Sequence, residues 1–577
     1  MFRILNLFNL NQKRTFFLLL ILITISSILE MASLAIIVPI INLFLEIENT
    51  SKEINLFWFK NFFNFSNFSI STFLLIFLIF FVLKTIFSIF VSWKHQNFIF
   101  QFVNKISFNL YSKYLSQDYK KYSQKNSSEL MRNILKEIDL FSIYLQSFIQ
   151  IILEGVILFG IFLFLIYLLT IPTIIVIFFS AFISVIYYLL VKKSLLVWGQ
   201  DRQNIEQDRI TYMQEGFSSI KEINFFNRND FFLNRFEVKN KKFYDININF
   251  YFLNSIPRFV FELFTIIIIS VIFVYLIFNN YPNEDIIKVV ALFLVASLRI
   301  IPSVYRIFNS IQSLKYSSSS FNVLYRDYSD LQIREKKSDN LKFKFDKKIN
   351  LQIKEFNYKN DQNFKLKDIT LNISKNQKIG IIGKSGSGKS TLIDILSGIL
   401  KDKNIQLKID DKLIQSDSDR YELQKKIGLI PQNISILNDT LKENILFGLS
   451  KKYYSDKEIL NILEISNLTN LLSNLPEGLN HQIKERGINF SGGEIQRIGI
   501  ARALIFNPEI LIFDEATSAL DTFTENEILK DINSLKNKTI IMISHRMNTL
   551  KYCEKIYLID EGKVIDEGDF SKFNEKY

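Results

Sequence analysis

Six long apolar segments in the N-terminal half constrain the fold of this chain more than any other feature. Hydrophobic residues make up 49% of the chain and Phe alone accounts for 57 positions, although the C-terminal half is polar. A helix of about 20 apolar residues is long enough to cross the hydrocarbon core of a bilayer. We therefore predict six membrane spans, at about residues 16–45, 70–92, 142–167, 170–191, 252–278 and 286–311.

Two basic segments between these spans predict the orientation of the chain. Residues 94–140 and 192–250 are polar and rich in Lys and Arg, and Lys13 and Arg14 precede the first span. Cytoplasmic loops of membrane proteins carry an excess of such residues, so the N-terminus and both segments are predicted to be cytoplasmic. Because both segments are too long for plain loops, we expect projecting helices with short cross-helices near 118–126 and 218–228.

Two features near the N-terminus need interpretation. A signal peptide is the alternative to the first span, but the apolar run is longer than such a peptide and no clean cleavage site follows it. Between the first two spans, aromatic residues recur at roughly helical spacing over 54–68. This pattern predicts a short helix at the outer membrane surface.

The net charge of +12 raises the question of a nucleic-acid partner. No aromatic and basic recognition motif accompanies the charge. Lys and Arg enrichment facing an anionic inner leaflet explains it, so we expect membrane lipids and no nucleic acid as partners. The single cysteine, Cys553, excludes an intrachain disulfide.

A glycine-rich loop in the C-terminal half has the pattern of a phosphate-binding loop. It follows an apolar run at 379–382 and precedes an amphipathic run at 391–400, the strand–loop–helix context that such a loop requires. Loop N–H groups and the positive end of the helix cradle phosphates, while Lys389 reaches the outer phosphates and Ser390 ligates Mg²⁺. The predicted nucleotide-binding residues are Gly383, Lys384, Ser385, Gly386, Ser387, Gly388, Lys389, Ser390 and Thr391.

A second apolar run, at 510–513, ends in the two carboxylates Asp514 and Glu515. This arrangement is typical of nucleotide hydrolases, in which one carboxylate holds Mg²⁺ and a neighbouring group polarises the attacking water. We predict the first role for Asp514 and the second for Glu515.

The segment Phe490-Ser491-Gly492-Gly493-Glu494 lies between the two motifs. With it the chain resembles the ATP-binding-cassette (ABC) family, whose signature reads Leu-Ser-Gly-Gly-Gln. This copy departs from the signature at its first and last positions. The resemblance implies ATP and Mg²⁺ as cofactors and contacts to ATP from Ser491, Gly492, Gly493 and Glu494.

Further motifs match the family in order over about residues 350–570. The resemblance implies that Tyr358 stacks on adenine, that Gln432 senses Mg²⁺, and that His545 contacts the γ-phosphate. The segment 518–521 matches a loop that crosses between two cassettes, which brings Asp521 to the nucleotide. The predicted catalytic residues are Glu515, His545 and Gln432, and the predicted Mg²⁺ ligands are Ser390, Gln432 and Asp514.

The order of the two halves resembles the ABC exporters. We therefore predict a multidomain membrane protein: an all-α domain of six transmembrane helices at 1–326, a linker at 327–348, and an α/β P-loop nucleotide-binding domain at 349–577. In the family, ATP lies between the P-loop of one cassette and the signature of another. The resemblance thus implies a homodimer in which ATP hydrolysis is coupled to transport.

Four cations in the predicted spans are candidates for substrate binding. Lys84 and Arg299 lie near mid-span. Arg306 follows Arg299 by two helical turns, and Arg258 lies in the cytoplasmic part of its span. Charges inside a membrane are costly and mark functional sites, and arginine binds phosphate through paired N–H groups, so an anionic lipid head suits this set. Alternatively, Arg258 and Arg306 extend to inner headgroups and Arg258 pairs with Glu262.

The transmembrane half is also similar to a narrower group, the lipid-linked oligosaccharide flippases of bacterial protein N-glycosylation. The similarity includes residues 28–30 before Pro39, Pro257-Arg258, and Arg299 through Pro302 to Arg306. Lys84 stands where that group would have arginine. The resemblance implies a polyprenyl-pyrophosphate oligosaccharide as substrate and a location in the bacterial inner membrane. A multidrug, lipid A-type or peptide exporter, and a non-transporting membrane ATPase that regulates a partner, are the alternatives.

Overall fold

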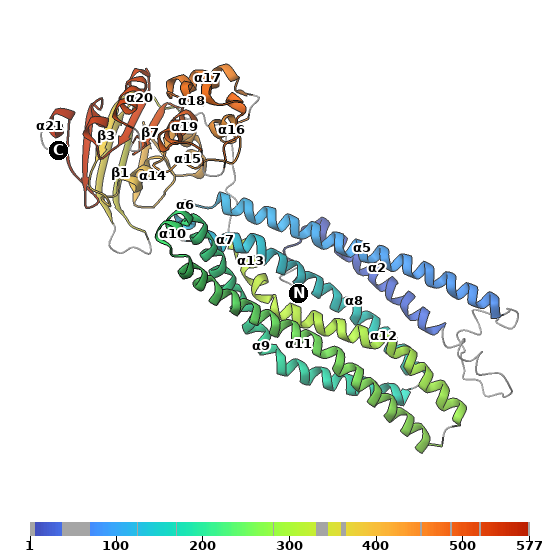
Figure 1. The fold of residues 1–577 in the computed structure, drawn as a ribbon. Coiled ribbons are helices and arrows are strands. Elements are labelled where there is room, and N and C mark those ends of the chain that lie inside the picture. The colour runs from blue at the N-terminus through green and yellow to red at the C-terminus, as the bar shows by residue number, and fades with distance from the viewer. Residues whose placement is uncertain are drawn as a thin grey trace. The chain divides into compact units, whose positions relative to one another are not determined.

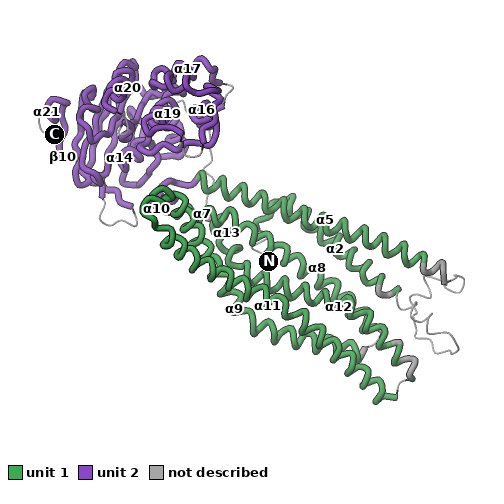
Figure 2. Tube along the Cα trace, viewed as in Figure 1, with its two compact units in different colours: residues 1–116, 125–333 green, residues 117–124, 334–577 purple. Residues whose placement is uncertain are grey.

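The computed structural model describes residues 6–36, 70–123, 125–168, 170–280, 282–330, 344–358, 365–450, 453–484, 487, 489–517 and 521–574. The chain forms two compact units, residues 1–116 with 125–333 and residues 117–124 with 334–577 (Figures 1 and 2). We refer to them as the transmembrane unit and the cassette. The predicted outer helix at 54–68 and the segment 518–520 lie outside the described residues.

The transmembrane unit is entirely helical in its described part. Its elements are α2 (Leu10–Ala35), α5 (Ile70–Ser116), α7 (Ser127–Arg132), the π-helical turn η2 (Asn133–Glu137), α8 (Ile138–Leu168), α9 (Thr170–Ser218), α10 (Ile220–Phe226), α11 (Asn229–Phe278), α12 (Asn283–Tyr316) and α13 (Ser318–Asp330). Six helical segments of the described residues are long and apolar enough to cross a membrane. The prediction of six spans is therefore confirmed.

The spanning helices are longer than the predicted spans. The second helix, for example, continues without a break from Ile70 to Ser116, whereas the apolar run ends near residue 92. A helix satisfies its own backbone hydrogen bonds, so it does not have to end where its side chains become polar. The basic segments at 94–140 and 192–250 are mostly such extensions. At the two predicted tips the chain forms the short helices α6 (Tyr119–Tyr122) and α10.

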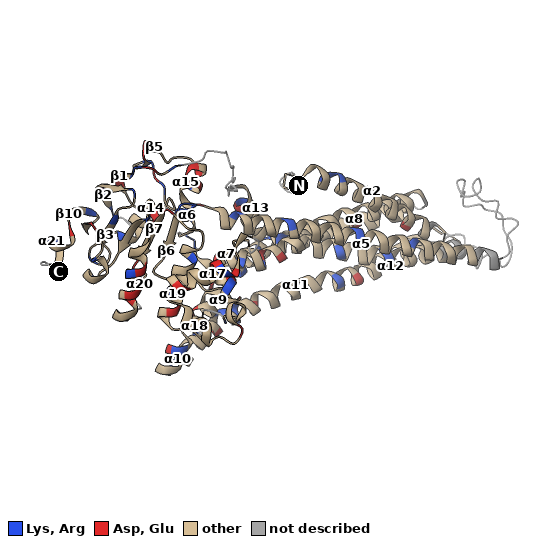
Figure 3. Ribbon diagram, turned by 90° about the horizontal axis from the view of Figure 1, so that it is seen from above, with Lys and Arg blue, Asp and Glu red and all other residues tan. Residues whose placement is uncertain are grey.

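Apolar contacts along the long helices form the core of the transmembrane unit. One cluster joins α2, α5, α8 and α13 through side chains such as Phe16, Phe102 and Phe141. A second joins α8, α9, α11 and α12. At Gly199 on α9 a Cβ would lie 2.2 Å from the carbonyl oxygen of Tyr316, so glycine permits close approach to α12. Charged side chains are few in the apolar stretches of these helices that are able to cross a membrane, whereas the polar extensions carry many, as the blue and red positions in Figure 3 indicate. The few charges in the apolar stretches are therefore conspicuous.

The cassette contains two sheets. The six-stranded sheet has the order β10-β9-β3-β8-β7-β6, with its neighbours parallel except for the antiparallel edge strand β10. The four-stranded antiparallel sheet has the order β2-β1-β4-β5. The strands are β1 (Lys348–Phe356), β2 (Leu366–Ser374), β3 (Lys378–Ile382), β4 (Ile405–Ile409), β5 (Lys412–Leu413), β6 (Ile427–Ile430), β7 (Ile510–Asp514), β8 (Thr539–Ile543), β9 (Lys555–Asp560) and β10 (Lys563–Gly568).

The cassette helices cover the six-stranded sheet and form a helical subdomain. They are α14 (Lys389–Leu396), α15 (Asp417–Gln424), α16 (Leu441–Leu446), α17 (Asp456–Ile465), α18 (Thr469–Asn474), α19 (Gly492–Leu504), α20 (Thr522–Ser534) and α21 (Phe570–Asn574), with the 3₁₀ turns η4 (Gly478–Asn480) and η6 (Met547–Leu550). Parallel strands buried on both faces read as continuous apolar runs, which explains the runs at 379–382 and 510–513. Ligands of such sheets bind at the carboxyl ends of the strands.

Candidate functional site

The predicted P-loop connects β3 to α14, the helix that begins at Lys389. Two glycines of the loop are required by its geometry. A Cβ at Gly383 would lie 2.1 Å from the carbonyl oxygen of Ile559 on β9, and Gly388 has a φ of 105°. Any other residue would clash at the first position and be strained at the second. The glycines thus allow a tight loop whose N–H groups precede the helix N-terminus.

The side chains of the loop form a cradle that fits phosphate groups. The Lys389 ammonium donates to the carbonyl oxygens of Gly383 and Lys384, at 2.8 Å each. The buried Ser387 hydroxyl has no hydrogen-bond partner among the residues that the structure describes. Buried polar atoms rarely go unpaired in proteins. A polyanion in the cradle provides acceptors for both groups, so these residues fit the phosphates of ATP.

Carboxylates gather beside this cradle, and their charges repel. Burial and the negative charge of Glu515 raise the pKa of Asp514, while Lys389 opposes the rise. Burial and the charge of Asp514 raise the pKa of Asp394, on α14, to about 6. A divalent cation relieves such repulsion, so the donor set fits Mg²⁺. Asp514 and the Ser390 hydroxyl are the residues that would hold it, and Mg²⁺ commonly keeps several waters as well.

The three predicted catalytic residues lie together in the structure. The Gln432 side-chain amide donates to Glu515 Oε2 at 3.0 Å, and His545 Nδ1 lies 3.8 Å from Glu515 Oε1. These residues lie one or two positions after the ends of β6, β7 and β8, which are neighbours in the sheet. The adjacent strand ends therefore bring these three residues together, although more than 110 positions separate Gln432 from His545 in the sequence. This arrangement can orient a water next to an acceptor carboxylate.

The signature segment caps the helix α19. Ser491 is the N-cap residue, and its hydroxyl accepts from the Glu494 backbone N–H at 3.3 Å. The Glu494 carboxylate accepts in return from the Ser491 backbone N–H at 2.7 Å. Glu and Gln both serve at this position of such a capping box, so the departure at Glu494 preserves the local structure. Gly492 and Gly493 open the helix, where free N–H groups attract anions.

The departure at Phe490 is also accommodated. The side chain packs against the apolar cluster of the helical subdomain, formed around α16, α17 and α19. A large apolar residue is all that this position requires, and Phe supplies it. Neither departure from the family signature thus disturbs the N-terminus of α19.

Tyr358 and Asp521 have local partners as well. Tyr358 packs edge-on against Phe356, with 5.3 Å between ring centroids, and burial raises its pKa while a hydrogen bond with Thr391 lowers it. This bond ties Tyr358 to the helix that follows the P-loop. Asp521 caps α20 by accepting from the Thr524 N–H at 2.9 Å. The contacts that the family resemblance implies for these two residues with adenine and nucleotide stay predictions.

Glu525 is a buried carboxylate of the site that the sequence analysis missed. It accepts from the hydroxyls of Thr517 and Thr549, at 2.8 and 2.7 Å, and from the Arg546 guanidinium at 3.2 Å. Thr517 lies two residues after Glu515, and Arg546 directly follows His545. One side chain therefore ties together the loops that carry two of the predicted catalytic residues. An acidic residue in the first turn of a helix looks like a dipole contact in sequence, which hides this role.

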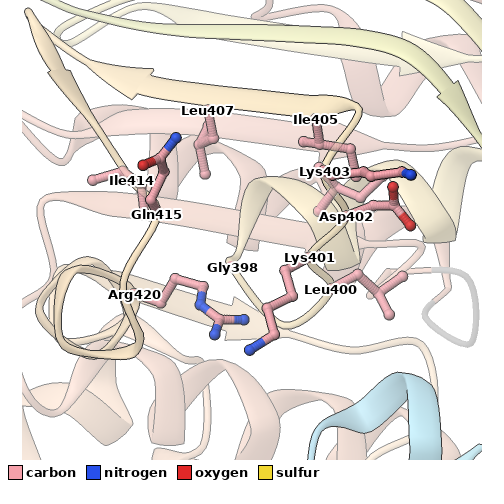
Figure 4. A pocket seen from close by; sticks show the side chains of 11 residues that line it. Gly398, Leu400, Lys401, Asp402, Lys403, Ile405, Leu407, Ile414, Gln415 and Arg420 are labelled. Carbon is pink, nitrogen blue, oxygen red and sulfur yellow. The ribbon is translucent and has the colours of Figure 1, made fainter.

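A separate cavity of about 460 Å³ in the cassette is lined by Lys401, Asp402 and Arg420 among others (Figure 4). None of the P-loop residues lines it. Its charges have partners within the cassette: Lys401 contacts Asp118 and Asp417 at 3.3 Å each, and Asp402 pairs with Lys120 at 3.0 Å. Asp118 is the N-cap residue of α6 and Lys120 lies within that helix. Two of the charged residues that line the cavity therefore contact α6.

The four predicted substrate cations all have acidic partners. Arg258 pairs with Glu262 at 2.9 Å, as the alternative interpretation proposed. Arg306 on α12 pairs with Glu154 on α8. Lys84 on α5 and Arg299 on α12 both contact Glu30 on α2, at 2.9 and 2.7 Å. The roles of Glu30 and Glu154 could not be predicted from the sequence, because partners on different helices leave no mark in local spacing.

Two families match the two halves of the chain. The family described as ABC transporter transmembrane region matches residues 16–298, and the family described as ABC transporter matches residues 366–518. Together they account for about three quarters of the sequence. The chain belongs to the ABC transporters. Its second half is an ABC-type ATPase domain, which uses ATP and Mg²⁺ as is general for the family, and its first half is a multi-span membrane domain.

Known proteins agree with this assignment. A solved bacterial Atm1-family ABC exporter with ATP bound superimposes with a TM-score of 0.78 over 98% of this chain and 96% of that one, at 17% identity, which shows a shared fold. A Rickettsia typhi export ATP-binding/permease protein is 40% identical over 228 residues, 39% of each chain. A Staphylococcus aureus multidrug export ATP-binding/permease protein is 37% identical over 214 residues, 37% of this ABC transporter and 36% of the relative. The two sequence matches span less than two fifths of these relatives' lengths.

Proposed function

We propose that this ABC transporter is a homodimeric, ATP-driven exporter that flips an anionic lipid-linked substrate from the inner to the outer leaflet of a bacterial inner membrane. The proposed substrate is a polyprenyl-pyrophosphate oligosaccharide. The observation that carries the substrate class is the presence of cations on three membrane-spanning helices: Lys84, Arg258, Arg299 and Arg306. A pocket for neutral drugs is mostly apolar and has no use for cations within the spanning helices. The N-terminus and the cassette are proposed to lie in the cytoplasm.

In this proposal the cassette residues keep the roles that their geometry supports. Glu515 polarises the attacking water, Gln432 and His545 orient groups around it, and the P-loop with Lys389 cradles the phosphates. The capped N-terminus of α19 presents Ser491 and Gly493 to the nucleotide of a second copy. Because each chain keeps Glu515, both composite sites of a homodimer are expected to hydrolyse ATP.

The substrate proposal is tested by ATP-driven transport in vesicles. Purified full-length protein is placed in proteoliposomes that contain a labelled polyprenyl-pyrophosphate glycan, and loss of label from one leaflet is followed after ATP addition. The Glu515→Gln variant is the control for movement that does not require hydrolysis. ATP-dependent loss with the native protein supports the proposal. Vesicles in which the native protein hydrolyses ATP without moving the lipid contradict it and leave the drug exporter and the regulatory ATPase.

The dimer proposal is tested by mixing two inactive variants. Ser491→Arg blocks the signature and Lys389→Ala removes the P-loop cation, so a mixed dimer contains one intact composite site and one doubly defective site. Mixing is expected to restore part of the ATPase rate. If mixed dimers form and no activity returns, the site is not shared in this way.

Multidrug export is the second candidate, favoured by the name of the Staphylococcus aureus relative. The same vesicles separate the two candidates when a cationic dye replaces the lipid. A drug exporter moves the dye and ignores the pyrophosphate lipid. The flippase does the opposite, because its cations repel a cationic dye.

A further inference from the structure

The cations of the transmembrane unit differ in how completely their charge is matched. Arg258 is exposed and has a carboxylate one turn away on its own helix, Glu262. Arg306 is bound by Glu154 through two of its nitrogens, Nε to Oε1 and Nη2 to Oε2, the second at 3.2 Å. Paired N–H contacts of this kind use the edge of the guanidinium that would otherwise receive a phosphate. Each of these arginines therefore has a carboxylate of its own.

Lys84 and Arg299, in contrast, share a single carboxylate. The buried Glu30 places Oε2 2.9 Å from the Lys84 ammonium and Oε1 2.7 Å from Arg299 Nη2. Two cations on one anion leave one positive charge unmatched among the described side chains that meet there. Unmatched charge is costly inside a membrane and is kept there for function. The surplus attracts an anion to the place where α2, α5 and α12 meet.

The same place also offers a hydrogen-bond donor to a ligand. Arg299 Nε is buried and finds no acceptor in the described part of the chain. Lys84 completes its contacts with the Ser33 hydroxyl at 3.1 Å, and that hydroxyl in turn donates to the Glu30 carbonyl oxygen. Buried donors without acceptors are rare in folded proteins. The orphan donor and the surplus charge are independent observations, and both indicate an anionic oxygen ligand.

We propose that Lys84 and Arg299 form the binding site for the phosphate head of the transported lipid, and that Glu30 is a built-in competitor for the same two cations. The identity of the anion as a lipid head rests on the proposed function. Without a ligand, Glu30 holds the two cations together against their repulsion. With a phosphate bound, the cations exchange part of their contact with Glu30 for contact with the phosphate, and Glu30 keeps the net attraction small enough for release. Arg306 and Arg258, already paired, contribute less.

The test is equilibrium binding to the full-length dimer in nanodiscs without ATP. The probe is farnesyl pyrophosphate, and farnesol and inorganic pyrophosphate separate the lipid tail from the anion. Glu30→Gln removes the competitor and is expected to tighten binding about tenfold, whereas Arg299→Gln and Lys84→Gln are expected to weaken it about tenfold or more. Lys84→Arg keeps the charge and is expected to bind like the native protein. Glu262→Gln is the matched control, since it removes an equal charge beside Arg258 and should leave binding unchanged.

Several results overturn the proposal. Unchanged binding in Arg299→Gln excludes the site, and tightening in Glu262→Gln equal to that in Glu30→Gln shows a general charge effect. If Glu30→Gln does not fold, Lys84→Gln still decides, because it leaves Arg299 and Glu30 as a neutral pair, and native-like binding by it excludes the site. Inorganic pyrophosphate that binds as tightly as farnesyl pyrophosphate excludes a lipid source for the anion.

The inference and the proposed function can fail separately. The predicted binding pattern without ATP-driven lipid movement in vesicles supports the site and contradicts the flippase. ATP-driven lipid movement that Arg299→Gln leaves at the native rate supports the flippase and contradicts the site.

Discussion

In both halves of this ABC transporter a carboxylate stands between partners from different elements, but the two arrangements arise differently. Glu515 in the cassette meets Gln432 and His545 because all three follow neighbouring parallel strands. Glu30 in the transmembrane unit meets Lys84 and Arg299 because three helices happen to present them to one another. Residues at strand ends are brought together by sheet topology, whereas residues on helix faces meet according to helix packing.

The two sites also differ in the sign of their unmatched charge. In the cassette the carboxylates near the P-loop repel one another, which contributes to the raised pKa of Asp514. This arrangement favours the binding of a cation. In the transmembrane unit two cations, Lys84 and Arg299, share the single carboxylate of Glu30. This arrangement favours the binding of an anion. The two sites are therefore suited to ligands of opposite sign, a cation in the cassette and an anion in the transmembrane unit.

The largest effect is expected for Glu515→Gln. A positioned general base contributes about 10²–10⁴-fold to rate, so ATP hydrolysis should fall at least about a hundredfold while MgATP still binds. Steady-state ATPase and nucleotide-binding measurements check this. Glu477→Gln, at an exposed position, is the matched control and should hydrolyse normally. Farnesyl pyrophosphate binding to the transmembrane unit should be unchanged, and native turnover in Glu515→Gln would sink the assignment.

The next effect concerns Arg306 and Glu154, which we interpret as a structural pair. Arg306→Met leaves a carboxylate that is 3% exposed without its cation, which costs about 3 kcal/mol for a buried pair. The thermal midpoint in nanodiscs should fall, and the double variant Arg306→Met/Glu154→Leu should recover most of it because both charges are gone. Lipid flipping should recover in parallel. A stable double variant that cannot flip shows instead that Arg306 contacts the substrate itself.

A smaller effect is expected for Glu525, which ties the Glu515 loop to the His545 loop. Glu525→Gln keeps an acceptor for Thr517 and Thr549 but turns an amide donor toward Arg546. The ATPase kcat is expected to fall about tenfold, or ~1.4 kcal/mol, with the KM for ATP nearly unchanged. Adding Arg546→Gln supplies an acceptor for that amide and should restore part of the rate. If the single variant changes only thermal stability, Glu525 does not position the catalytic loops.

The smallest effect is a pH dependence of cassette stability. The pKa of Asp394 is raised from its ordinary 3.8 to about 6 by burial and by Asp514. In the folded state this carboxyl therefore holds its proton more tightly than in the unfolded state, and its contribution to stability is full below about pH 4 and lost as pH rises through about 6. Nucleotide-free protein should lose thermal stability over this range less steeply in Asp394→Asn. Asp411→Asn, at an exposed position, should keep the native slope, and equal slopes in all three proteins refute the assignment.

Much of the cassette site could be predicted because its signals are local. The P-loop, the Asp514 and Glu515 pair and the signature segment each lie within a few consecutive residues, flanked by runs that indicate their strand or helix. Glu525 and Asp394 were missed for the opposite reason. Their importance depends on burial beside residues that are distant in sequence. In the sequence Glu525 looks like a dipole-stabilising residue in the first turn of α20, and Asp394 looks like a solvated residue of α14.

In the transmembrane unit, too, features with a local sequence signal could be predicted, and contacts between distant residues could not. Apolar runs predicted six spans, since a bilayer demands a minimum apolar length, and the polar segments predicted helices that project beyond them. That α5 and α9 continue without a break to Ser116 and Ser218 is seen only in the structure. The spacing of Arg258 and Glu262 on one helix suggested their contact as the alternative to substrate binding. Local spacing could not predict that Arg306 meets Glu154 or that two cations share Glu30.

The amino-acid sequence was sufficient to predict the order of the two domains, the number of spans, the chemistry of the P-loop and the residues that follow the strands. These features depend on apolar length, glycine conformation and motifs within single turns of chain. Only the tertiary structure decided which cations are matched and which are not, and which buried carboxylates join separate loops. Such pairings depend on which helices and loops become neighbours, because Coulombic and hydrogen-bond contacts act over a few ångströms in space and not along the chain.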